Sequence, residues 1–350
     1  MSKNLKFRPR RLGPLLALGC LLAAFAVIPV ASSNQVHQTT GWITVPGQGP
    51  SLQVHGGWLV AASDDSVHHT HGPDGQIGGD DPVEMAKSAY TDGTCTAIGC
   101  LPGTSGPEEI SCVPSSASHF AVIYARPLDG PDRSALIIPF LRHSIYDMSG
   151  FIDKRASSLS ALARARLKVV CDTDGTPAVA TSVLPTTSDA DSFASIIGDL
   201  STQGFNQTNT KYIVFYDDCP NPCYAGQGTV ADDDSGSGGN SSNRGPDYAV
   251  EYSSLKLPAW NTLLHETSHA MGAVQNSAPH SSGAWHCNDG LDVMCYGDGG
   301  STSAYDGNAC ADIVFDCNHD DYFDPNPSVG SYLSNHWNIA AAYNDFLDHS

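Results

Sequence analysis

The stretch NTLLHETSHAMGAVQNSAPHSSGAWHC, residues 261–287, decides the fold and the chemistry expected of this chain. His265 and His269 are four residues apart, and Glu266 follows the first of them. One helical turn brings such a pair to one face, where two imidazole nitrogens can bind zinc. Glu266 then lies where a general base can reach a water on the metal. The stretch therefore predicts a metal-binding helix over residues 257–272.

Two histidines are one ligand short of a zinc site, and Gly272 indicates where the third is to be sought. A helix can end at a left-handed glycine, which lets the chain turn back toward the metal. In the compact form of this pattern the third ligand stands at position 275, but Gln275 is a poor zinc ligand.

The returning segment offers two histidines for the third position. His280 is the preferred candidate because it is nearer the end of the helix, and Pro279 stiffens its approach. His286, beside Cys287, is the alternative. Asp289 and Asp292 are carboxylate alternatives, since carboxylates also bind zinc.

The motif HETSHAMG (residues 265–272), followed by DVMCY (residues 292–296), resembles the metzincin clan of zinc metallopeptidases. The resemblance spans residues 265–296 and departs from the clan pattern at Gln275. It implies that Met294 forms an apolar floor beneath the zinc-bound imidazoles. It also implies that Tyr296 binds zinc or stabilises the tetrahedral intermediate.

The function implied is that of a secreted zinc endopeptidase that acts on protein or peptide substrates with Glu266 as general base. Two alternatives stay open. One is an inactive secreted binding or surface protein that keeps the fold, which Gln275 in the usual ligand position favours. The other is a zinc hydrolase that acts on a non-peptide bond.

The remaining chain predicts a mixed α/β domain over residues 116–350 because strand-like and helix-like segments alternate. Strands are expected at residues 119–127, 134–142, 211–218 and 248–253, with two short strands around a turn at 174–175, and helices are expected at residues 149–166, 188–205 and 331–347. The resemblance implies a metzincin-like zincin fold with a twisted mixed sheet, an active-site helix and a loop-rich, disulfide-linked C-terminal part. The resemblance also implies that residues 248–252 form an edge strand, with which an extended substrate can pair; a purely structural strand is the alternative.

The N-terminal 31 residues read as a secretory signal, with a basic start, an apolar run and a small-residue exit. An uncleaved membrane anchor is the alternative, because the apolar run is long enough to span a bilayer. Residues 32–115 are rich in Gly, Ser, Asp and Pro and are expected to be an irregular propeptide or extension. The expected location of the mature chain is extracellular.

Charge and cysteine content agree with export. Removing residues 1–31 takes away five basic residues and no acidic one, which leaves 12 basic against 37 acidic residues and a formal charge of −25. Such a chain repels nucleic acid and anionic membranes. Ten of the 11 cysteines remain, and an even number in an exported chain predicts disulfides. Cys95/Cys100, Cys219/Cys223 and Cys287/Cys295 are close pairs.

The acidic stretch DIVFDCNHDDYFDPNP, residues 312–327, raises the question of calcium. Asp316, Asn318 and Asp320 alternate as in the opening of a calcium loop. The EF-hand pattern fails, because Asp321 and Pro327 stand where it requires glycine and glutamate. A calcium site of another kind is one expectation, and a solvated loop tied by Cys310 and Cys317 is the other.

Overall fold

The computed structural model describes most of the chain from residue 109 onward and four short strands before it. The described residues are 41–43, 52–54, 57–61, 66–71, 109–188, 190–220, 225–252, 258–295, 309–310 and 313–350. The expected signal segment, Cys95, Cys100 and Tyr296 therefore lie outside the described residues. No helix within the described ranges is long and apolar enough to cross a membrane.

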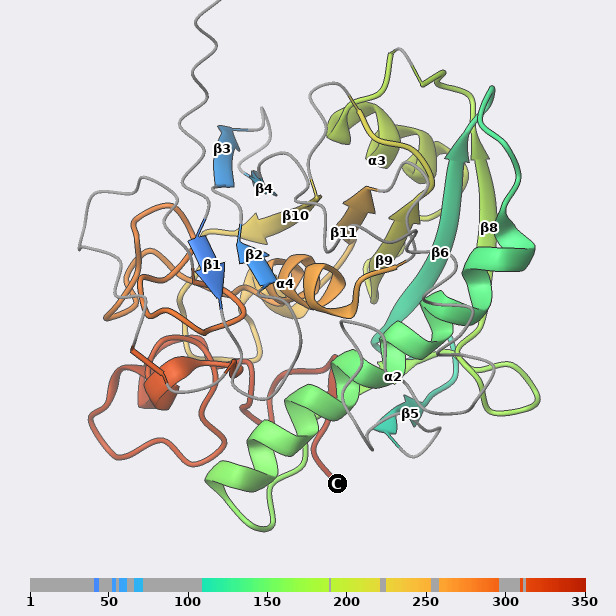
Figure 1. Cartoon of the computed structure of the whole chain (residues 1–350). Helices are drawn as coiled ribbons and strands as arrows, with labels where there is room; N and C mark the ends of the chain where they lie inside the picture. The colour runs from blue at the N-terminus through green and yellow to red at the C-terminus, as the bar shows by residue number, and fades with distance from the viewer. Residues whose placement is uncertain are drawn as a thin grey trace, which may run out of the picture. The chain divides into compact units, whose positions relative to one another are not determined.

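A mostly parallel sheet forms the centre of the unit that spans residues 38–350 (Figure 1). Its strands, in chain order, are β3 (Gly57–Ala61), β4 (Ser66–His71), β5 (Ser111–Cys112), β6 (His119–Pro127), β7 (Arg166–Val169), β8 (Val179–Leu184), β9 (Thr210–Tyr216), β10 (Gly226–Ala231), β11 (Asp247–Tyr252) and β12 (Leu347–Asp348). β6 pairs in parallel with β8 and β9, and β9 pairs in parallel with β11. β10 is antiparallel to β11 on one side and to β4 on the other. A separate pair joins β1 (Gly41–Ile43) to β2 (Leu52–Val54).

The expectation of a mixed α/β domain is confirmed, but the place given to residues 248–252 is wrong. They lie in β11, which has β9 on one side and β10 on the other, so it is an interior strand. Its backbone groups are committed to these neighbours and cannot receive a substrate strand. The segment 32–115, expected to be irregular, contains β1 to β5 among its described residues.

The central strand β9 shows why the sheet is covered on both faces. All seven of its residues are buried. Because side chains alternate along a strand, Ile213 and Phe215 enter one apolar cluster, while Tyr212, Val214 and Tyr216 enter the other. A strand buried on both faces reads as a continuous apolar run, as residues 212–216 do.

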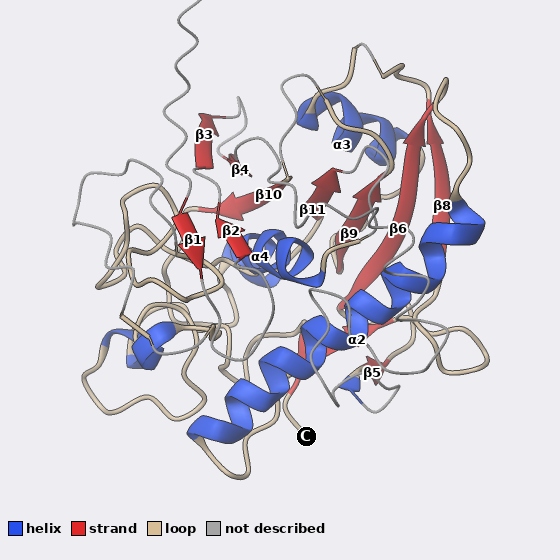
Figure 2. Cartoon of the chain, viewed as in Figure 1, coloured by secondary structure: helices blue, strands red, loops and turns tan. Residues whose placement is uncertain are grey.

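Three helices cover the two faces of the sheet (Figures 1 and 2). They are α2 (Ser134–Leu159), α3 (Phe193–Thr202) and α4 (Trp260–Ala270). Helices α2 and α4 contribute to the same apolar cluster as Ile213 and Phe215. Helix α3 packs on the opposite face, in the cluster that contains Tyr212 and Val214.

The strand predicted for residues 134–142 is wrong, because this segment forms the first third of α2. Its β-branched residues and Pro139 favoured a strand. However, Ile137, Leu141 and Ile145 recur every four residues and are fully buried on one face. Burial of that face against the sheet outweighs the local preference.

The helix predicted for residues 188–205 is confirmed as α3, although it begins later. Ser192 caps it: the Ser192 side chain accepts a hydrogen bond from the Ser195 backbone N–H, and the Ser195 side chain accepts one from Ser192 N–H. This reciprocal pair is a capping box, which satisfies two backbone donors of the first turn.

The C-terminal part is rich in loops and linked by disulfides, as expected (Figure 2). Disulfides join Cys112 to Cys171, Cys287 to Cys295, and Cys310 to Cys317. The 3-10 turns described here and upstream are Ser241–Asn243, Cys317–His319 and Tyr332–Ser334.

The terminal helix predicted for residues 331–347 is wrong. The Asn338 side-chain oxygen accepts hydrogen bonds from the N–H groups of Asp324 and Ala340. The side-chain oxygen of Asn344 accepts a hydrogen bond from Phe346 N–H. Asparagine side chains that bond nearby backbone compete with helix formation, and here they hold the chain in turns instead.

Candidate metal centre

Helix α4 places two histidines on its buried face, as the sequence predicts. His265 and His269 are 4% and 0% exposed. Their Nε2 atoms lie 3.0 Å apart, and the ring centroids are 4.7 Å apart. The four-residue spacing therefore brings the Nε2 atoms of the two imidazoles close together.

His286 is the third imidazole at this point. Its Nε2 atom lies 3.1 Å from the Nε2 atom of His269, and its ring stacks on that of His265 at 5.3 Å. It is 1% exposed. The three histidines form one group whose ring nitrogens can share a metal ion, and we call it the histidine cluster.

His280, which the sequence favours as the third ligand, is not in the histidine cluster. Its Nδ1 atom lies among the carboxylates of Asp289, Asp320 and Asp321 instead. The course of the loop explains why His286, rather than His280, joins the cluster: a β-bridge pairs Ser281 with Cys287. The bridge sets His280 near the open end of a narrow loop and His286 on its returning arm. The third histidine therefore cannot be chosen by how near it lies in the sequence to the end of α4.

Backbone carbonyls fix the orientation of both helix histidines. His265 Nδ1 donates to Val293 O and His269 Nδ1 donates to Ala273 O, each at 2.7 Å. A carbonyl only accepts hydrogen bonds, so each Nδ1 carries the proton and each Nε2 of the neutral ring carries a lone pair. Metal-binding histidines are usually oriented by such a partner on the other ring nitrogen.

The facing lone pairs mean that the cluster is suited to a cation. Two unprotonated Nε2 atoms 3.0 Å apart repel each other unless a positive charge lies between them. A proton can bridge one pair of nitrogens, whereas a metal ion can bind all three. Ligands about 2.0–2.2 Å from a tetrahedral zinc ion lie roughly 3.3–3.6 Å apart, close to the separations seen here.

Glu266 is fully buried beside the cluster, on the side of α4 that faces β10. Burial raises the pKa of its carboxyl group to about 8, against the opposing effect of His265. A carboxyl group with a pKa near neutrality is suited to accept and then release a proton.

Two glycines of β10 let α4 approach this closely. A Cβ atom at Gly226 would lie 2.6 Å from Glu266 Oε1. One at Gly228 would lie 2.8 Å from the Glu266 carbonyl oxygen and 2.9 Å from His269 Cβ. The absence of side chains at these two positions thus sets the distance between α4 and the sheet.

We expect Gly228→Ala to push α4 away from β10 and displace His269. Overpacking of this kind costs about 1–3 kcal/mol, so the free energy of unfolding should fall by that amount and metal affinity should fall with it. Gly198→Ala is the matched control, because Gly198 lies inside α3 with no atom within 4 Å of its added Cβ. That change should raise stability by up to about 1 kcal/mol. Denaturant unfolding measures the free energy of unfolding of both variants. Equal effects of the two substitutions would contradict the close approach of α4 to β10.

Met294 is fully buried in the turn predicted from the DVMCY motif. Its N–H donates to Asp292 Oδ1, and the neighbouring Val293 carbonyl accepts the hydrogen bond from His265. The Cys287–Cys295 disulfide closes this turn directly after His286. The same short segment therefore supports two of the three histidines.

Gln275, which stands at the usual ligand position, has a structural role that the sequence did not indicate. Its side-chain amide donates to Ala231 O at 3.0 Å and to Gly272 O at 2.9 Å. It is 3% exposed. Gln275 thus ties the segment after α4 to the end of β10. The third imidazole is instead supplied from further along the chain, by His286.

The calcium candidates have different partners. Both carboxylate oxygens of Asp316 accept backbone N–H groups, from Asp321, Tyr322 and Phe323. Asn318 donates to Asp289 Oδ2. Asp320 lies beside His280. Asp316 thus organises the loop rather than facing an ion.

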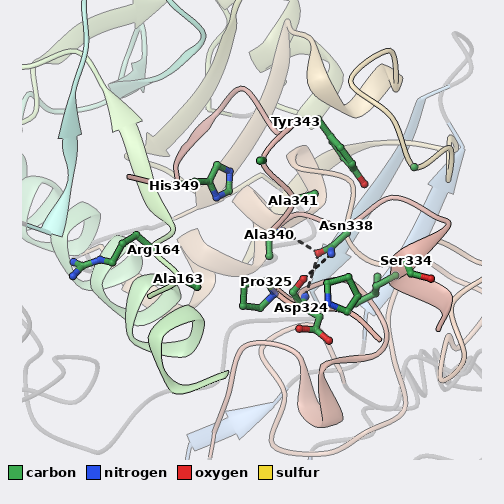
Figure 3. Close-up of a pocket in the computed structure, with 14 residues that line it drawn as sticks. Ala163, Arg164, Asp324, Pro325, Ser334, Asn338, Ala340, Ala341, Tyr343 and His349 are labelled. Carbon is green, nitrogen blue, oxygen red and sulfur yellow. Dashed lines mark hydrogen bonds between the residues drawn. The ribbon is translucent and has the colours of Figure 1, made fainter. Parts of the chain in front are cut away.

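A pocket of about 390 Å³ lies in the C-terminal part of the chain (Figure 3). Asp324, Leu333, Asn338 and Tyr343 are among its lining residues. None of the histidines of the cluster lines it, and the polar groups of Asn338 are used in holding the backbone of Asp324. We assign no chemistry to this pocket.

Comparison with known proteins adds little to this geometry. No family model and no curated protein matches the chain. Among solved structures, wild-type OgpA from Akkermansia muciniphila is similar at 10% sequence identity, with 64% of this chain and 70% of that chain covered and a TM-score of 0.31. A likeness this weak carries no conclusion about fold or activity, so the assignment of function depends on the site itself.

Proposed function

We propose that the protein is a secreted zinc-dependent endopeptidase. The observation that carries the proposal is the meeting of three buried imidazoles, two of them with lone pairs turned toward one point by backbone acceptors. Three histidine ligands with a remaining open position are typical of catalytic rather than structural zinc. The proposal is also supported by two features that resemble the metzincin clan, the motif HETSHAMG at residues 265–272 and the buried Met294.

His265, His269 and His286 would hold the ion. Zinc bound there would polarise a peptide carbonyl and lower the pKa of a water molecule at the open position. The chain supplies the rest of the chemistry. Glu266 takes the proton of the attacking water and passes it to the leaving amine, and its raised pKa of about 8 suits both steps.

Two further residues are assigned by resemblance. Met294 packs as the apolar floor of the site, which agrees with its complete burial. Tyr296, two residues later and outside the described part of the chain, is proposed to stabilise the negative charge that develops on the carbonyl oxygen. Protein or peptide substrates are the proposed partners, and the acidity of the chain argues against nucleic acid.

The rival proposal of an inactive binding protein depended on Gln275. It loses that support, because Gln275 holds the backbone and His286 supplies the third imidazole.

Removal of the metal tests the proposal. We expect the purified chain to cleave casein or gelatin, to lose cleavage in a zinc chelator, and to recover it when zinc is restored. Mass spectrometry of the products would identify the broken bonds. Cleavage that persists after zinc has been removed would contradict the proposal, and hydrolysis of ester but not protein substrates would favour a non-peptide hydrolase.

A further inference from the structure

A second group of metal-ligating side chains lies on the loop that carries His286. It consists of His280, Asp289, Asp320 and Asp321, whose ligand atoms all lie within 4.8 Å of one another. We call it the aspartate–histidine group. His280 and Asp289 come from the two arms of the 280–289 loop, where Asn288 N–H donates to His280 O. Asp320 and Asp321 come from the loop that follows Cys317.

The distances in this group are those of ligands around an ion. His280 Nδ1 lies 3.4 Å from Asp289 Oδ2, 3.5 Å from Asp320 Oδ1 and 3.5 Å from Asp321 Oδ2. Ligands about 2.0–2.2 Å from a tetrahedral ion lie roughly 3.3–3.6 Å apart.

A protonated His280 explains these distances less well. Burial lowers the pKa of His280, but the neighbouring carboxylates outweigh it and raise the pKa overall. A charged N–H nevertheless hydrogen-bonds a carboxylate at about 2.7–2.9 Å. The Nδ1 atom has only one hydrogen and is equally far from three carboxylates, so a proton alone does not account for the arrangement.

Buried atoms without hydrogen bonds point into the same space. Asp321 is the decisive one: its side chain is 1% exposed, and its Oδ2 atom makes no hydrogen bond while its Oδ1 accepts from His280 N–H. His280 Nδ1 and Asp320 Oδ1 are likewise buried and without a hydrogen bond. Buried polar atoms are costly when unsatisfied, and one cation between them removes that cost at all three.

We propose that His280, Asp289, Asp320 and Asp321 form a second metal site, distinct from the histidine cluster, that binds a transition-metal dication such as Zn²⁺ or Mn²⁺. The imidazole nitrogen disfavours Ca²⁺, which takes oxygen ligands, while the three carboxylates suit Mn²⁺ and Zn²⁺. A dication reduces the charge of three carboxylates from −3 to −1. His280 and Asp320 are 39% and 38% exposed in their side chains, which gives the ion a path from solvent.

The site joins two loops that are also linked by hydrogen bonds from His280 N–H to Asp321 Oδ1 at 2.8 Å and from Asn318 Nδ2 to Asp289 Oδ2 at 3.1 Å. Since His286 lies between His280 and Asp289 in the chain, the ion holds the base of the loop that delivers the third imidazole to the histidine cluster. Its role is structural.

Metal stoichiometry in paired variants tests the proposal. The full chain is stripped with a chelator, reloaded with Zn²⁺ or Mn²⁺, freed of unbound ions and measured by elemental mass spectrometry. We expect about two ions per wild-type chain, one in Asp321→Asn, one in His286→Ala, and none in the double variant. Asparagine keeps the acceptor for His280 N–H, and circular dichroism checks the fold. Asp320→Asn, at the exposed side of the group, is the second variant if Asp321→Asn does not fold.

The outcomes separate this site from the histidine cluster. If both aspartate variants bind as many ions as the wild type, the second site is overturned. Binding of Ca²⁺ but not of Zn²⁺ or Mn²⁺ would overturn the assignment of the ion. If the aspartate variants lose one ion while His286→Ala loses none, the second site stands and the proposed zinc centre at the histidine cluster fails.

Discussion

Replacing Glu266 with glutamine is expected to lower the rate of peptide cleavage by about 10²- to 10⁴-fold, the range that general acid–base catalysis contributes. Glutamine has nearly the shape of glutamate but cannot take a proton from water. Because Glu266 is fully buried and its pKa is raised by that burial, loss of its charge should not destabilise the chain. Kinetics on a cleaved peptide, with zinc content measured in parallel, provide the comparison.

Glu251→Gln is the matched control for this substitution. Glu251 is also buried and lies on β11, where its Oε1 atom accepts the N–H of Ala259 just before α4. Glutamine retains that acceptor, so cleavage should change little. The proposed role of Glu266 is refuted if its glutamine variant cleaves as fast as the wild type with normal zinc content.

Substitution of the third imidazole should have an effect of similar size, now on metal binding. We expect His286→Ala to lose tight zinc binding at the histidine cluster and cleavage with it. The loss should exceed the roughly 10- to 100-fold that follows removal of a partner outside the ligand shell. Zinc affinity measured by chelator competition, and cleavage of the same peptide, report the two losses.

His280→Ala separates the two candidates for the third ligand. His280 lies among carboxylates rather than beside His265 and His269, so its alanine variant should keep an ion at the histidine cluster. If His280→Ala instead abolishes zinc binding there while His286→Ala retains it, the position of the loop described above is incorrect.

The sequence predicted the part of the site that depends on local geometry. His265 and His269 share a face because helical spacing alone requires it, and Met294 is buried as the turn motif implied. The choice between His280 and His286 depended on contacts far apart in the chain. The Gln275 bonds to β10 and the Ser281–Cys287 bridge set the course of the loop, and no spacing rule contains them.

The same distinction explains the fold. Residues 119–127 were predicted as a strand and form β6 with those bounds, because their apolar content matches their position inside the sheet. Residues 134–142 have similar composition but form a helix, since their four-residue apolar spacing packs on the sheet face. The C-terminal segment departs from its expected helix because the side chains of Asn338 and Asn344 bond backbone groups two residues ahead and also those of Asp324 and Ile339.

Anomalous X-ray diffraction at the zinc absorption edge, on crystals of the zinc-loaded chain, tests the central claim most directly. The account predicts a peak within about 2.0–2.1 Å of the Nε2 atoms of His265, His269 and His286. A peak bound by His265, His269 and any residue other than His286, or no peak between these imidazoles at full zinc loading, would contradict it.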